Sequence, residues 1–122
     1  MSLKPRIAID AMGGDEGVRV MIAGAALARR RHDGLRFTLC GDEAQIVAAL
    51  ENHPNLRAAS EVVHAPNVVD GSDKPSQAIR KKDSSMALAI QAVKEGKAGA
   101  AVSAGNTGAL MAMAKLALRT MP

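Results

Sequence analysis

The sequence predicts an α/β fold, a three-layer α/β/α sandwich built around a mostly parallel sheet. Short β-branched or alternating apolar runs follow one another along the chain, and between them lie segments whose apolar residues have helical spacing. Glycines, prolines and helix-capping residues separate these segments, as expected for repeated strand–helix–strand units. Hydrophobic residues make up 48% of the 122 residues, with one Phe and no Tyr or Trp. Small aliphatic side chains must therefore fill the core.

The first unit is a strand at residues 6–10, which ends at a glycine cluster, followed by a helix at residues 18–31. The helix carries three arginines in its last turn, where the negative end of the helix dipole favours cations. We expect Gly34 to end it. The apolar residues that share one face of this helix are Val18, Ile22, Ala25 and Ala26.

The next elements are a strand at residues 35–41, a helix at residues 43–51 that Asp42 caps, and a strand at residues 60–66. A polar segment containing glycine and proline, residues 67–77, is predicted to be a long loop.

A helix over residues 83–96 follows, capped by Asp83 or Ser84. The last predicted elements are a strand at residues 98–104 and a helix at residues 107–119. Because right-handed crossovers place successive helices on the two faces of a parallel sheet, the chain should form three layers. The sequence stops just after its last predicted helix, which favours a truncated domain.

Composition excludes several classes of protein. The net charge of +4 favours acidic partners only in a general way. Phe37 is the one aromatic residue that could stack on a base, which argues against binding of single-stranded nucleic acid. Cys40 is the only cysteine, so no internal disulfide forms and a cytoplasmic location is the default. The early charged residues leave no room for a signal peptide, and no apolar run is suited to span a membrane. The scattered histidines predict no metal site.

The segment 103–108, "SAGNTG", joins a buried strand to a helix through a glycine turn. Free backbone N–H groups and the positive end of the helix dipole make such a junction an anion site. Ser103, Asn106 and Thr107 add side-chain donors, while Gly105 and Gly108 allow close approach of the backbone. The alternative is that Asn106 or Thr107 only caps the helix.

The end of the first strand, "DAMGGDEG", has a related composition. Asp15 and its neighbour Glu16 lie where the pyrophosphate of a dinucleotide would rest, which argues against a Rossmann cradle. Asp10, at the strand tip, could accept a hydrogen bond from a substrate or a loop donor, or it could tie the glycine turn together.

A third candidate is the segment 72–86, in which Lys74 and Arg80 precede two serines at a predicted helix start. Arg80 offers bidentate donors to phosphate, and Ser84 and Ser85 with the helix N-terminus could add more. The alternative is an ordinary solvated face, because acidic residues interleave with the basic ones.

Three segments, "IAIDAMGGD", "KPSQAIR…SSM" and "VSAGNTGALM", together resemble the bacterial acyl-acyl carrier protein:phosphate acyltransferases of phospholipid synthesis. The resemblance runs nearly end to end, and Val18 departs from it because the family usually has a proline there. It implies that residues 1–122 form the N-terminal part of a single α/β/α catalytic domain. The implied fold is similar to isocitrate dehydrogenases and phosphotransacetylases.

The resemblance also implies an enzyme that transfers a fatty acyl group from acyl-acyl carrier protein to inorganic phosphate, as a homodimer, with no metal or redox cofactor and no nucleic acid partner. Peripheral contact with a membrane stays open. The residues expected to act are Asn106, Asp10 and Ser103 in catalysis, and Gly13, Gly14, Asp15, Arg80, Ser84, Ser85, Gly105, Thr107 and Gly108 in binding phosphate or substrate.

Alternative functions are a phosphotransacetylase-type transferase that uses coenzyme A, a non-catalytic nucleotide- or phosphate-binding domain, and an interaction domain whose glycine turns are only caps. The choice of acyl donor separates the first of these from the carrier-protein enzyme. Binding of phosphate at residues 105–108 separates the enzymes from the interaction domain.

Overall fold

A computed structural model describes residues 6–12, 17–67, 74, 76 and 83–103. Its four strands form one parallel sheet in the order β3-β2-β1-β4. The strand bounds are Arg6–Asp10 for β1, Arg36–Gly41 for β2, Ser60–His64 for β3 and Ala100–Ser103 for β4. The predicted α/β class and parallel sheet are confirmed.

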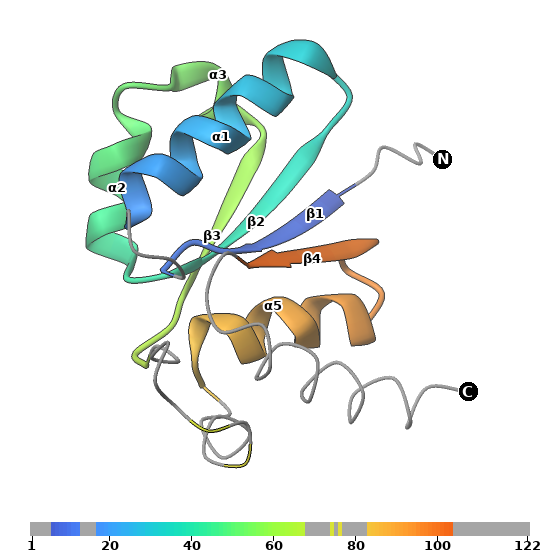
Figure 1. The fold of residues 1–122 in the computed structure, drawn as a ribbon. Helices are drawn as coiled ribbons and strands as arrows, with labels where there is room; N and C mark the ends of the chain where they lie inside the picture. Colours follow the sequence, from blue (N-terminus) through green and yellow to red (C-terminus); the bar gives the residue numbers. More distant parts are fainter. Residues whose placement is uncertain (1–5, 13–16, 68–73, 75, 77–82, 104–122) are drawn as a thin grey trace.

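Helices cover both faces of the sheet, so the described residues form three layers (Figure 1). Among the described helices, α1, α2 and α3 lie on one face of the sheet and α5 lies on the other. Their bounds are Val18–Arg31 for α1, Glu43–Leu50 for α2, Pro54–Ala58 for α3 and Ser85–Lys94 for α5. None of the helices in these described ranges combines the length and apolar character that crossing a membrane requires.

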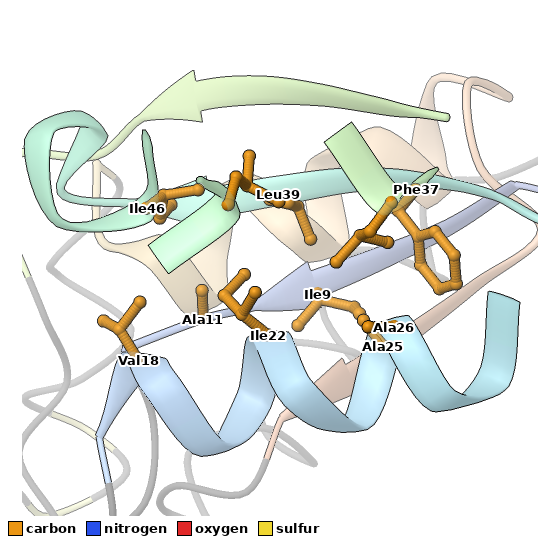
Figure 2. Packing of buried hydrophobic residues seen from close by; sticks show 11 residues of the cluster. Ile9, Ala11, Val18, Ile22, Ala25, Ala26, Phe37, Leu39 and Ile46 are labelled. Carbon is orange, nitrogen blue, oxygen red and sulfur yellow. The ribbon is translucent and has the colours of Figure 1, made fainter. Parts of the chain in front are cut away.

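The larger core lies between the sheet and α1–α3, where aliphatic side chains from α1 interdigitate with those of β1 and β2 (Figure 2). Phe37, the chain's one aromatic residue, is 1% exposed there. The face of α1 predicted from helical spacing is the buried one, as expected when an apolar stripe drives packing. Its members are Val18, Ile22, Ala25 and Ala26.

The second core, between α5 and the other face of the sheet, is built from small side chains. Ala8 of β1 and Cys40 of β2 meet Ala89 and Ala92 of α5. Because these side chains are short, the helix backbone can lie close to the sheet. Sheet residues at the C-terminal strand ends can therefore reach the first turn of α5.

Three local predictions need correction. Gly34 does not end α1, because the helix stops at Arg31 and His32 is its C-cap. The short helix α3 was not predicted, although Pro54 stands at its start, where the missing N–H of proline has no cost. Ser76 is helical within the segment predicted as a loop. The helix predicted for residues 107–119 lies outside the described residues.

Candidate functional site

The candidate site lies where β1 and β4 end side by side. The chain runs from β1 to β2 to β3 in one direction across the sheet, then returns through α5 to place β4 on the other side of β1 (Figure 1). This reversal makes the β1–β4 pair the topological switch point of the described sheet. In open α/β sheets, ligands bind in the crevice beyond the carboxyl ends of the strands at such a point.

Asp10 is the centre of this junction. Its side chain is 1% exposed, and Ser103 is its register partner on β4. Ser103 Oγ donates to Asp10 Oδ2 at 2.9 Å. Ser85 Oγ, from the first turn of α5, donates to Asp10 Oδ1 at 2.5 Å, and the backbone N–H of Met12 donates to the same oxygen at 3.1 Å. Three segments of the chain are therefore joined through one buried carboxylate.

The first turn of α5 is held in place by its own hydrogen bonds. Ser84 is the N-cap, and its Oγ accepts from the Ala87 N–H at 3.0 Å. Of the two predicted caps the structure selects Ser84, because Asp83 instead accepts from Asn67 Nδ2 at 2.7 Å. The Asn67 carbonyl accepts from the Ser85 N–H at 3.0 Å, which ties the segment after β3 to the start of α5.

The neighbouring end of β2 adds an apolar wall. Cys40 is the register partner of Asp10 on that strand and is fully buried. Burial first, and then the negative charges of Asp10 and Glu61, raise the pKa of the Cys40 thiol to about 12. Cys40 thus packs as a small buried apolar group.

The structure brings together three residues that were singled out separately in the sequence: Asp10, Ser85 and Ser103. It places Ser84 one residue away as the helix cap. Lys74 is exposed. The other predicted site residues lie outside the described residues: Gly13, Gly14, Asp15, Arg80, Gly105, Asn106, Thr107 and Gly108.

Two contributors were missed from the sequence, the backbone N–H of Met12 and the side chain of Asn67. The Met12 contact has a local signal, because an aspartate side chain commonly accepts from the backbone two residues further on. Asn67 had no such signal, since its partners lie 16 and 18 residues away in sequence.

From the sequence, Asp10 could either accept a hydrogen bond from a substrate or loop donor or tie the glycine turn together. The carboxylate ties the turn after β1 through Met12, and it also accepts from two hydroxyls on other elements. The first turn of α5 contributes the positive end of a helix dipole, which stabilises a buried anion. Within the described ranges, no group of three or more His, Cys, Asp or Glu side chains is placed to hold a metal ion. The arrangement can thus fix hydroxyls and loop backbone at a strand–helix junction.

Comparisons with known proteins identify relatives of this chain by sequence. A profile of the family described as "Fatty acid synthesis protein" matches residues 5–122. The chain is 69% identical over 123 residues to a protein named phosphate acyltransferase from Erythrobacter litoralis (strain HTCC2594), covering 100% of this chain and 34% of that protein. Proteins of the same name from Bradyrhizobium diazoefficiens and Rhodopseudomonas palustris (strain BisA53) are 59% and 57% identical over 124 residues, again over 100% of this chain and over 35% and 36% of theirs.

The chain spans about a third of the length of these curated relatives. The family match covers the parallel sheet, the α5 junction and all three segments that carry the resemblance. The chain belongs to the fatty acid synthesis protein family.

Proposed function

We propose that this chain forms part of an enzyme that transfers a fatty acyl group from acyl-acyl carrier protein to inorganic phosphate. The names of the relatives support phosphate acyl transfer, and the family description supports a place in lipid synthesis. The observation that carries the proposal is the position of Asp10, Ser85 and Ser103 at the switch point between β1 and β4. That crevice is where an α/β sheet takes its ligand.

The proposed reaction is a single acyl transfer. A phosphate oxygen attacks the thioester carbonyl carbon and forms the new C–O bond. The C–S bond then breaks, and the carrier leaves as a thiolate that takes up a proton. Phosphate is already a nucleophile at neutral pH, so the protein's part is to bind its charge, align it with the carbonyl and stabilise the oxyanion.

The residues proposed for this work surround the junction in sequence. Backbone and side-chain donors at residues 104–108 would bind phosphate or the oxyanion, since these residues follow β4 directly. Residues 13–15, which follow β1, would form the facing wall. Arg80 would bind a phosphate group from the third side, while Ser84 and Ser85, which are fully buried and already hydrogen-bonded, would hold the start of α5 in place. The proposal includes a homodimer, with acidic acyl carrier protein as the second substrate.

The test uses the full-length protein that carries this chain, because the chain covers only a third of its relatives. Acyl phosphate formation is measured with acyl-acyl carrier protein and, separately, with acyl-coenzyme A. We expect the carrier-protein thioester to be the better substrate by kcat/KM. Preference for coenzyme A would replace this proposal with the phosphotransacetylase-type reaction, and no acyl phosphate from either donor would refute it.

Asn106→Ala tests the donor segment in the same assay. Loss of one oxyanion donor typically lowers the rate by about 10²–10³-fold, and we expect a loss of that size. Asn55→Ala is the matched control, because Asn55 is exposed on α3, on the opposite face of the sheet from α5. An unchanged rate for Asn106→Ala would remove Asn106 from the mechanism.

A further inference from the structure

The Asp10 carboxylate receives all of its described donors from its own chain. Both of its oxygens are used, Oδ1 by Ser85 and the Met12 N–H, and Oδ2 by Ser103. The side chain is 1% exposed. A substrate could reach this carboxylate only by moving the groups packed around it, which is costly in a close-packed interior.

We infer that Asp10 is a positioning residue for the proposed phosphate site, acting through Ser103 and Ser85 and not by touching substrate. This inference rests on the proposed function. Asp10 sits where the loop after β1, the end of β4 and the start of α5 meet, so one carboxylate sets the distance between all three. The end of β4 at Ser103 is then held at a fixed point.

Electrostatics also favours a positioning role for Asp10 over direct contact with phosphate. A bare carboxylate beside a phosphate site would repel the ligand, since both are anions. Here three donors and the first turn of α5 neutralise much of the Asp10 charge. Charged acceptors also form the stronger class of hydrogen bond, so the anchor is stiff. The carboxylate can therefore organise the junction at a small cost to phosphate affinity.

The direction of the hydroxyl protons makes the inference testable. Ser85 and Ser103 both donate to Asp10. An ionised carboxylate can take both bonds because each of its oxygens is an acceptor. An amide of the same shape accepts on its oxygen and donates from its nitrogen. Asp10→Asn therefore keeps at most one serine bond in its present direction and forces the other hydroxyl to turn. The shape of the side chain stays the same.

The experiment measures steady-state kinetics of the full-length protein with phosphate and acyl donor varied separately, at a temperature where each variant is folded. We expect Asp10→Asn to raise KM for phosphate about tenfold, the equivalent of one net hydrogen bond, with KM for the acyl donor unchanged. Ser103→Ala should have an effect of similar size. Ser103→Thr, which keeps the hydroxyl at a half-buried edge position, should restore the wild-type value.

Ser60→Ala is the matched control. Ser60 Oγ also donates a partly buried hydrogen bond, to the Leu56 carbonyl at 2.6 Å. Ser60 lies at the start of β3, at the other end of the strands from Asp10. Its loss should leave KM for phosphate unchanged. Because Asp10 and Ser103 act as one unit, Asp10→Asn combined with Ser103→Ala should cost no more than the larger single effect.

Two results would overturn the inference. One is an unchanged KM for phosphate in both folded Asp10→Asn and Ser103→Ala; the other is a loss confined to kcat, which would place Asp10 on the reacting atoms. Phosphate binding measured by calorimetry separates this from the proposed function. If wild type binds phosphate and Asp10→Asn binds it more weakly, the positioning role holds even when no acyl phosphate forms.

Discussion

The Met12 side chain lies directly against Gly41, the last residue of β2. A Cβ atom at Gly41 would stand 2.7 Å from Met12 Cγ and 2.9 Å from Met12 Sδ, with Ile46 Cδ1 at 3.2 Å. The backbone of Met12 is itself held by Asp10. The absence of a side chain at Gly41 thus lets the turn after β1 pack over the neighbouring strand.

Gly41→Ala should therefore destabilise the protein by about 1–3 kcal/mol, the usual cost of overpacking. The free energy of unfolding is measured by denaturant titration. Gly34→Ala is the control, because a Cβ there meets nothing within 4 Å. Equal stability of Gly41→Ala and wild type would show that Met12 moves aside without cost.

Asp42→Ala should lower the melting temperature in a pH-dependent way. Hydrogen bonds from Gln45 come first among the causes that hold the pKa of Asp42 below its ordinary value of 3.8, helped by the Ala44 N–H and by His64. A lowered folded pKa means that the stabilisation is fully present above pH 3.8 and is lost as the pH falls through the folded value.

The measurement is the difference in melting temperature between wild type and Asp42→Ala at pH 7 and at a series of pH values below 4. We expect the difference to be constant near neutrality and to shrink in acid. A difference that persists undiminished in strong acid would mean that the ionised cap is not its source.

Cys40 should resist thiol reagents in the folded protein. Its side chain is fully buried, and its pKa of about 12 leaves almost no thiolate at pH 8. Labelling with a chromogenic disulfide reagent should be slow in native buffer and fast in denaturant. Fast labelling under native conditions would contradict the packing of Cys40 of β2 against α5.

Ser84→Ala should remove the N-cap of α5 and cost about 1 kcal/mol of stability. Its hydroxyl accepts from the Ala87 N–H, and the residue is fully buried. Ser84→Gly should cost at least as much, because at this buried helix start the Ala87 N–H then has neither the side-chain acceptor nor water. Wild-type stability in both variants, measured by denaturant titration, would show that the Ser84 hydroxyl does not cap α5.

Most local elements could be predicted because their causes are local. Helical spacing of apolar residues identified α1 with its observed bounds, and the Asp42 side chain capped α2 as expected. The first strand also has its predicted bounds. The helix α3 was not predicted because five residues are too few to show helical periodicity. Pro54 was its one sequence signal.

The candidate site could also be predicted only in part. Its residues could be chosen from the sequence, since small polar groups after buried strands and at helix starts point to ligand chemistry. Their partners could not, because the bonds from Ser85 and Ser103 to Asp10 span 75 and 93 residues. No local pattern encodes a contact over that distance.

By itself the sequence determined the class of fold, the alternation of strands and helices, and the small polar residues at the strand ends. Those features follow from side-chain periodicity and capping, which act over a few residues. The strand order, and with it the meeting of β1, β4 and α5 at Asp10, was decided only by the tertiary structure. Right-handed crossovers and the burial of two helix layers select that order, and both depend on the whole sheet.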